Sequence, residues 1–348
     1  MKLKPIPAQA LHGANLHEAI ARFGGCVSDW LDLSSAVSPY SWLDECGTEL
    51  PLASAHHLPA ADDAFAAAQR AYYGRTGLAL AGSQEAIRLL PGCFAPADVW
   101  VLKGTYGEHA LRWSMAGHQV QELSETAIRA RISAGDQPGC VVLVNPGNPG
   151  GERFAPAEIL HWAEHMAGGW LVVDETFIDL TPQQSLLAAL DELPSNLIVL
   201  RSPGKFFGLA GLRAGFVFAS QAVTAALAAH AGPWTLSGPA QHWVTQALND
   251  RDWQQAQRER LATARQRMQA LFSGWPVVAA TDLFFTLESP DAARWHNALA
   301  GQKIWTRLFA QQQRLRLGLP ATEADVRRLG QVLEALHNSN PLNGAGRE

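Results

Sequence analysis

Short apolar runs alternate with longer helix-like segments through the middle of the chain. Five such runs, rich in branched side chains, cover residues 99–102, 140–144, 170–173, 197–200 and 215–218. Continuous apolar runs of this length are typical of strands whose two faces are both covered. The pattern therefore predicts an α/β fold, with a mostly parallel, mixed sheet carrying helices on both sides.

The pattern changes near residue 239. From Pro239 to about Phe272 a long segment rich in Gln, Arg and Ala predicts one helix that connects two domains. A β-α-β-α series follows, with strands expected over 277–287 and 314–319 and helices over 291–299 and 323–336. We therefore expect an N-terminal arm over 1–35, a large domain over 36–238, the connecting helix and a small α+β domain over 239–337, and a tail over 338–348.

Composition narrows the class of protein. A chain of 348 residues exceeds one ordinary core, which agrees with a large and a small domain. A net charge of −5 gives no support to nucleic-acid binding. No apolar stretch is long enough for a membrane span or a signal peptide, so we expect a cytoplasmic protein. The four cysteines have neither CxxC nor Cys/His spacing, so no disulfide framework and no metal site are predicted.

Candidate chemistry begins where the fourth apolar run ends. Ser202-Pro203-Gly204-Lys205 follows that run, and Arg213 stands eight residues beyond the lysine. Burial and nearby positive charge lower the pKa of a lysine, and a neutral amine forms Schiff bases. A guanidinium group can hold a phosphate through two hydrogen bonds. The segment suits a lysine that binds pyridoxal 5'-phosphate (PLP), although a solvated surface lysine is the alternative for Lys205 taken alone.

Other polar residues follow the remaining apolar runs. Asp174 comes at the end of one run, where open α/β sheets place ligands, and would pair with a protonated pyridine nitrogen; a helix cap is the alternative. Residues 145–151, with two Asn-Pro steps, predict a rigid bend that presents an amide. Ser83 opens a helix whose free N–H groups suit a phosphate or simple capping. Tyr106 suits stacking on an aromatic cofactor or ordinary packing.

In this order the motifs resemble the fold type I, aspartate-aminotransferase-like PLP enzymes, from about residue 12 to 336. The matching segments are Gly82-Ser83-Gln84, Tyr106, Asn145-Pro146-x-Asn148-Pro149, Asp174-Glu175, Ser202-x-x-Lys205, Arg213-x-Gly215 and Arg316-Leu317-Gly318. The ordered set is far more specific than any one member.

The resemblance implies a role for each residue. Lys205 would form the Schiff base with the cofactor, Asp174 would pair with its ring nitrogen, Asn148 would donate to its O3' and Tyr106 would cover its ring. The residues implied for the cofactor phosphate are Ser83, Gln84, Ser202 and Arg213. The resemblance also implies a homodimer with the active site at the subunit interface.

Within that group the chain is most similar to the threonine-phosphate decarboxylases of cobalamin biosynthesis. The similarity lies in His12-Gly13-Ala14-Asn15, Ile304-Trp305-Thr306-Arg307 and Arg316-Leu317-Gly318-Leu319-Pro320. It implies that the substrate's phosphate and carboxylate bind to His12, Asn15, Arg307 and Arg316, with Asn148 nearby. The expected reaction is decarboxylation of L-threonine O-3-phosphate to (R)-1-amino-2-propanol O-2-phosphate. The alternatives are an aminotransferase of the histidinol-phosphate type, which shares nearly every motif, and a non-catalytic binding protein.

Two departures from the aminotransferase pattern stand out. Phe177 occupies the position where related aminotransferases usually have a tyrosine that donates to O3', and residues 57–59 read His-Leu-Pro instead of Arg-Tyr-Pro. A tyrosine supplied to the partner subunit would then have to be Tyr40, Tyr72 or Tyr73.

Overall fold

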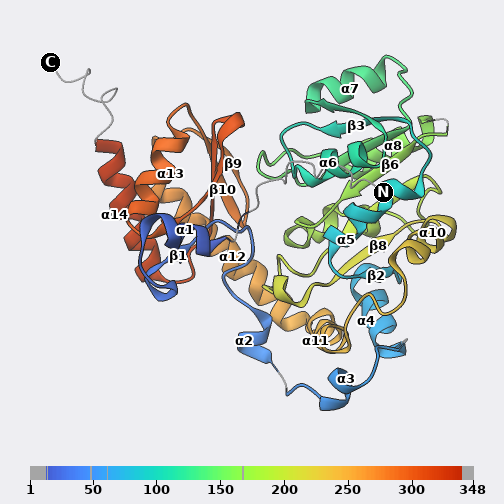
Figure 1. Ribbon diagram of the computed structural model, residues 1–348, viewed down its shortest axis with the longest axis horizontal. Coiled ribbons are helices and arrows are strands. Elements are labelled where there is room, and N and C mark those ends of the chain that lie inside the picture. The colour runs from blue at the N-terminus through green and yellow to red at the C-terminus, as the bar shows by residue number, and fades with distance from the viewer. Residues whose placement is uncertain (1–12, 14, 48, 61, 167, 339–348) are drawn as a thin grey trace, which may run out of the picture.

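The computed structural model describes residues 13, 15–47, 49–60, 62–166 and 168–338. Two bodies lie side by side in Figure 1, a large domain built around one sheet and a small domain, joined by a long helix. None of the helices in these ranges combines the length and the apolar character that crossing a membrane requires.

A seven-stranded mixed sheet, in the order β2-β8-β7-β6-β5-β3-β4, forms the centre of the large domain. Its five strands from β7 to β4 are parallel, and β8 runs antiparallel to both of its neighbours. The strands are β2 (Leu78–Leu80), β3 (Asp98–Leu102), β4 (Gln119–Leu123), β5 (Cys140–Val144), β6 (Trp170–Asp174), β7 (Leu197–Arg201) and β8 (Gly215–Phe218). All five apolar runs are strands, which confirms the predicted sheet.

Helices cover both faces of this sheet (Figure 1). Val99 and Val101 of β3 pack with α5, α6 and α10, whereas Trp100 and Leu102 pack on the opposite face with α7 and α8. Successive side chains of a strand point to opposite faces, so a strand with two buried faces must be apolar throughout. The helices of the large domain are α2 (Trp42–Cys46), α3 (Leu52–His56), α4 (Asp63–Tyr73), α5 (Ser83–Leu89), α6 (Glu108–Met115), α7 (Glu125–Ser133), α8 (Pro156–His165), α9 (Leu186–Ala189), α10 (Gln221–Ala231) and α11 (Gly238–Asn249).

The single helix expected over 239–272 is two helices. α11 ends at Asn249, and α12 (Arg251–Leu271) begins after Asp250, whose side chain accepts the N–H of Trp253. A capping aspartate starts a new helix because it satisfies an N–H group that lacks a partner in the first turn. α11 packs against α4 of the large domain, so α12 alone makes the connection to the small domain.

The small domain contains a four-stranded antiparallel sheet in the order β12-β13-β10-β9. The segment predicted as one strand over 277–287 forms two strands, because residues 281–283 reverse the chain. The elements are β9 (Val277–Ala280), β10 (Phe284–Glu288), α13 (Ala292–Gly301), β12 (Arg307–Phe309), β13 (Arg314–Gly318) and α14 (Glu323–Asn338).

The described part of the N-terminal arm belongs to the small domain by its contacts. β1 (Leu31–Asp32) pairs in parallel with β11 (Ile304–Trp305), and α1 (Leu16–Phe23) packs near α13. Short 3-10 turns complete the chain at η1 (Val27–Asp29), η2 (Leu90–Cys93), η3 (Ile178–Leu180), η4 (Pro182–Gln184), η5 (Ala210–Leu212) and η6 (Ala310–Gln312).

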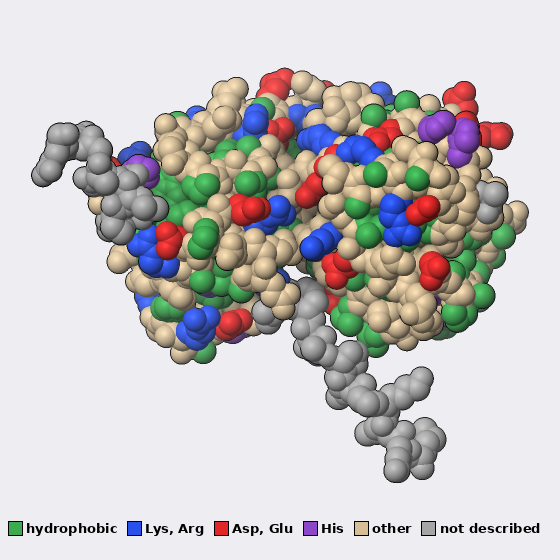
Figure 2. All heavy atoms as spheres, turned by 90° about the horizontal axis from the view of Figure 1, so that it is seen from above, with side chains coloured by type: hydrophobic (Ala, Val, Ile, Leu, Met, Phe, Trp, Pro, Cys, Tyr) green, Lys and Arg blue, Asp and Glu red, His purple; other side chains and the backbone are tan. Residues whose placement is uncertain are grey.

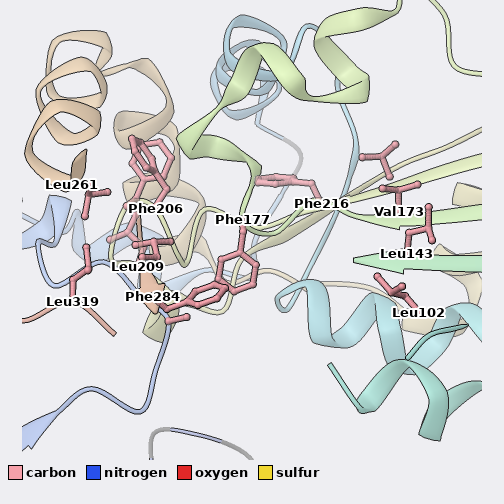
Figure 3. Packing of buried hydrophobic residues seen from close by; sticks show 14 of the residues in the cluster. Leu102, Leu143, Val173, Phe177, Phe206, Leu209, Phe216, Leu261, Phe284 and Leu319 are labelled. Carbon is pink, nitrogen blue, oxygen red and sulfur yellow. The ribbon is translucent and has the colours of Figure 1, made fainter. Parts of the chain in front are cut away.

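One hydrophobic core runs through both domains. Figure 3 shows Leu102, Leu143 and Val173 on one face of the large sheet, and Phe177 lying against Phe284 of the small domain. The rings of Phe177 and Phe284 meet edge to face, with their centroids 5.7 Å apart. The two domains are therefore joined by packing as well as by the chain.

A buried ion network fixes the segment that follows β6. The guanidinium group of Arg201, on β7, contacts the carboxylates of Glu175, at 3.4 Å, and Asp179, and donates to Ser185 Oγ at 3.0 Å. Arg201 is 3% exposed, and Glu175 and Asp179 are fully buried. Two buried carboxylates therefore share one cation.

We predict that Arg201→Met lowers the free energy of unfolding by about 3–5 kcal/mol, because it leaves two buried carboxylates without their cation. Urea denaturation followed by circular dichroism measures the change. Arg267→Ala serves as the control, since the ion pair of Arg267 with Glu323 is about half exposed, and exposed pairs contribute little. Equal stability of Arg201→Met and the unaltered protein would show that the network is dispensable.

Candidate active site

A cavity of about 310 Å³ lies where the carboxyl ends of the parallel strands face the small domain. Figure 2 shows Lys and Arg side chains near the middle of one face, where the two domains meet. Ten of the twelve residues predicted for the site line this one cavity. They are Ser83, Gln84, Tyr106, Asn148, Asp174, Ser202, Lys205, Arg213, Arg307 and Arg316.

Lys205 lies in the loop after β7, and its amine faces the ring of Phe177 at 5.9 Å from the centroid. Burial lowers the pKa of Lys205 to about 8, and the positive charges of Arg316 and Arg213 act in the same direction against the attraction of Asp174. A lysine with this pKa has a large neutral fraction near neutral pH, and the neutral amine is the nucleophilic form.

Asp174 ends β6 and is held by three hydrogen bonds. His109 Nε2 donates to its Oδ2 at 3.1 Å, while the backbone N–H and the hydroxyl of Thr176 donate to its Oδ1 at 3.0 and 2.5 Å. Burial by itself would raise the pKa of Asp174, but the hydrogen bonds from His109 and Thr176 hold it below its usual value. The carboxylate therefore stays ionised although it is 4% exposed.

His109 is a site residue that no sequence motif indicated. It is buried in the first turn of α6, and its ring meets that of Tyr106, which precedes the helix, edge to face with centroids 6.4 Å apart. A histidine three residues after a site tyrosine is the signal that was available, but its contact with Asp174 depends on how α6 packs on the sheet.

A second buried acid, Glu108, ties several side chains together at the same end of α6. Gln84 Nε2 donates to Glu108 Oε2 at 2.7 Å, and Arg112 Nε donates to the same oxygen at 2.8 Å. The hydroxyl of Tyr106 donates to Gln84 Oε1 at 2.8 Å. Burial, helped by the charge of Glu108, raises the pKa of Tyr106 to about 12, so its hydroxyl stays protonated. The Gln84 amide, predicted to bind phosphate, is engaged with these side chains.

The start of α5 forms a cradle for an anion. Gly82 has a φ of +85°, and a Cβ atom at Gly215 would lie 2.2 Å from the backbone nitrogen of Ser83. A Cβ at Gly82 would lie 2.8 Å from Nη2 of Arg213, so the guanidinium group sits directly beside this helix start. Helix N-termini with free N–H groups and a nearby guanidinium are typical binding sites for phosphate.

Arg316, on β13, faces the cavity from the small domain. Its Nη1 donates to Asn148 Oδ1 at 2.5 Å and its Nη2 donates to the carbonyl of Ser34 at 2.6 Å. Burial lowers the pKa of Arg316 to about 9, with the positive charge of Arg307 adding to the effect. Burial also lowers the pKa of Arg307. Because both arginines are costly to keep charged here, the pair favours a ligand that carries negative charge.

The two remaining predicted site residues, Asn15 and His12, come from the N-terminal arm. Asn15 caps α1, where its side chain accepts the N–H of Glu18 and donates to that residue's carboxylate, both at 3.3 Å, and it does not line the cavity. His12 lies outside the described residues. Gly13 does line the cavity, and a Cβ there would lie 2.6 Å from the Ser34 carbonyl.

The three tyrosines considered for a partner subunit all have contacts within this chain. The hydroxyl of Tyr72 donates to Asp179 at 3.0 Å, and Tyr73 is 3% exposed. The guanidinium of Arg260 lies over the ring of Tyr40 at 4.4 Å. Packing therefore holds Tyr72 and Tyr73 inside the large domain.

Comparison with known proteins gives the family. Residues 56–333 match the family described as aminotransferase class I and II. A threonine-phosphate decarboxylase from Pseudomonas aeruginosa is 45% identical over 327 residues, which cover 92% of this chain and 96% of that protein. One from Sinorhizobium sp is 40% identical over 343 residues, covering 94% and 98%.

Solved structures agree on the fold. The crystal structure of L-threonine-O-3-phosphate decarboxylase from Porphyromonas gingivalis superposes with a TM-score of 0.75 at 18% identity and covers 88% of this chain and 99% of that one. The family match and the similarity over nearly the whole length agree with the fold and with the cavity that the predicted residues line. The chain therefore belongs to the aminotransferase class I and II family and, within it, to the threonine-phosphate decarboxylases.

Proposed function

We propose that this chain catalyses the PLP-dependent decarboxylation of L-threonine O-3-phosphate to (R)-1-amino-2-propanol O-2-phosphate, as a step of cobalamin biosynthesis in the cytoplasm. The observation that carries the proposal is that Lys205 and Arg316 line the same cavity, where the charge of Arg316 lowers the pKa of Lys205. The 45% identity to a threonine-phosphate decarboxylase supports the choice of substrate.

The residues present fit PLP. The anion cradle at Gly82 and Gly215, with Arg213 beside it, has the chemistry of a phosphate site, and Asp174 is an ionised acceptor for a ring N–H. Lys205 supplies the amine, and Tyr106 supplies a ring at the cavity wall. The residues that would hold the cofactor are Ser83, Gln84, Tyr106, Asn148, Asp174, Ser202, Lys205 and Arg213. When bound, PLP withdraws electrons from the α-carbon of an attached amino acid, so that a bond at that carbon can break.

Lys205 and Asp174 divide the proton chemistry between them. Asp174, held ionised by His109 and Thr176, keeps a proton on any ring nitrogen that it contacts. Lys205 Nζ, with a pKa of about 8, can both give and accept a proton near neutral pH. In the proposed reaction Lys205 Nζ delivers the proton that replaces the lost carboxyl group at the α-carbon.

Arg316 and Arg307 select the bond that breaks. The groups that hold the substrate's anions would fix its orientation and so determine which bond at its α-carbon breaks. Arg316 is fixed by Asn148 and by the carbonyl of Ser34, which gives its guanidinium one orientation. We infer that Arg307 and Arg316, with His12 and Asn15 of the arm, would hold the substrate's phosphate and carboxylate and so favour loss of the carboxyl group.

We further propose that the enzyme is a homodimer. Three large apolar side chains are exposed near α3 and the start of α11: Leu52 at 84%, Leu58 at 66% and Trp234 at 59%. Gly238 approaches the backbone of Ser54 so closely that a Cβ would lie 2.1 Å from its carbonyl oxygen, which joins these segments into one surface. Apolar side chains gathered on a surface are typical of protein interfaces.

We predict that purified protein loaded with PLP releases CO2 from L-threonine O-3-phosphate over many turnovers without any 2-oxo acid. Radioactive CO2 from carboxyl-labelled substrate measures the reaction. Lys205→Ala should lower the rate by at least about 10²-fold, because no amine then carries the proton, whereas Lys103→Ala, at an exposed lysine, should not. A single turnover without loss of carbon, restored by a 2-oxo acid, would instead identify an aminotransferase.

The low pKa of Lys205 leads to a pH prediction. The neutral amine predominates above about pH 8 and is lost as the pH falls, so capture of PLP by the cofactor-free protein should slow tenfold per pH unit well below 8. Arg316→Met removes a positive charge that lowers this pKa, so the midpoint should move to higher pH. Borohydride trapping at a series of pH values measures both midpoints, and an unchanged midpoint in Arg316→Met would contradict the assigned cause.

Dimer formation has its own test. The double variant Leu58→Glu and Trp234→Glu places charges on the exposed apolar surface and should convert the dimer to a monomer in size-exclusion chromatography with light scattering. Val27→Glu, at a side chain that is 61% exposed on η1, is the control and should stay dimeric. A monomeric unaltered protein, or a double variant that stays dimeric, would overturn this assignment.

A further inference from the structure

The last turns of α8 carry a cluster of metal-binding side chains on the outside of the large domain. His161, Glu164 and His165 are all exposed, and one ligand atom from each lies within 4.8 Å of the other two. None of the three lines the active-site cavity. The scattered cysteines gave no indication of a metal site, and this cluster contains no cysteine.

The helix explains the grouping. Positions i, i+3 and i+4 share one face of a helix, so His161, Glu164 and His165 point the same way. Trp162 and Ala163, between them, are buried against the sheet and hold that face outward. Figure 2 shows histidine and acidic side chains close together at the large-domain end of the molecule.

The two imidazole rings are already close. Their centroids are 4.1 Å apart, and their planes are tilted by 43°. In a tetrahedral zinc site, bonds of about 2.0–2.1 Å place the ligand atoms roughly 3.3 Å from one another. The side chains therefore need a shift of about 1.5 Å at most, which exposed side chains reach by small rotations.

A hydrogen bond prepares one histidine for binding. His165 Nδ1 lies 2.7 Å from the backbone carbonyl of His161, and since a carbonyl only accepts, Nδ1 carries the hydrogen. The lone pair is then on Nε2, the atom at the outer edge of the ring. Metal-binding histidines commonly have their other nitrogen fixed by such a bond, which sets the tautomer and the direction of the ring.

The surrounding charges also favour a cation. His165 is the last residue of α8, where the carbonyl groups of the final turn give the helix end a partial negative charge. Within the described residues, the carboxylate of Glu164 forms no ion pair with a lysine or arginine. A cation bound here therefore does not have to displace a charged side chain.

We propose that the final turns of α8 bind a divalent transition-metal ion of the zinc, nickel and copper class. His161 and His165 supply imidazole nitrogens, and Glu164 supplies a carboxylate oxygen. Imidazole ligands favour these ions over magnesium and calcium, which prefer oxygen. Three protein ligands leave a position for water or for a side chain of another molecule.

Isothermal titration of the PLP-loaded protein with zinc chloride, in a buffer without chelators or phosphate, tests the proposal. One zinc ion per chain should bind. His161→Gln and His165→Gln should each weaken binding by at least about tenfold, because loss of a ligand costs no less than loss of a supporting contact. Glu164→Gln should weaken it less than either, since an amide oxygen remains.

Two controls complete the experiment. His17→Gln removes an exposed histidine on α1 that has no histidine four residues beyond it, and it should leave zinc binding unchanged. Circular dichroism should show that each variant keeps its helices, because the three side chains are exposed. Zinc binding by both α8 histidine variants with the unaltered affinity, or no binding by the unaltered protein, would overturn the proposal.

Discussion

The active site depends on the cost of keeping several charges together away from water. Lys205, Arg213 and Arg316 line one cavity with a single carboxylate, Asp174, among the residues assigned to the site. Burial and the positive charge of neighbouring arginines lower the pKa of Lys205 and of Arg316, whereas hydrogen bonds hold the pKa of Asp174 low and keep it ionised. The residues assigned to the site therefore carry more positive than negative charge, which favours anionic ligands. Affinity for such ligands and the reactivity of the lysine have the same physical origin.

Much of this site could be predicted from sequence because its parts follow strands. A strand whose two faces are both covered is seen in the sequence as a continuous apolar run. A polar residue directly after such a run lies at the edge of the sheet where α/β proteins bind ligands. That reasoning found Asp174, Asn148 and Lys205. Site residues carried on helices were harder to predict. His109 and Glu108 reach the site only because α6 packs on the sheet in one particular rotation about its axis, and the local sequence pattern does not give that rotation.

The local sequence pattern also left two features of the fold unpredicted. β4 was not predicted because it is an edge strand whose residues are mostly exposed, so it lacks an apolar run. The long helix was expected to be continuous because nothing in its composition shows that Asp250 caps a second helix instead of continuing the first. Asn15, assigned to the substrate by resemblance, caps the first turn of α1 in this structure, and its role at the substrate stays a prediction. Capping and ligand binding use the same polar groups, and sequence does not distinguish them.

The close approach of Gly215 to Ser83 also limits how this enzyme can change. Any side chain at residue 215 would push β8 away from the start of α5, since a Cβ atom would lie 2.2 Å from the backbone nitrogen of Ser83, far inside van der Waals contact. β8 is the strand that joins β2 to the rest of the sheet, so the disturbance would reach the sheet edge as well as the anion cradle. The small domain, by contrast, lines the cavity with the side chains of Arg307, Phe309 and Arg316, on β12 and β13, which can be replaced without this backbone overlap. Changes in what the cavity accepts are therefore expected on its small-domain side, around a helix start that has no room to change.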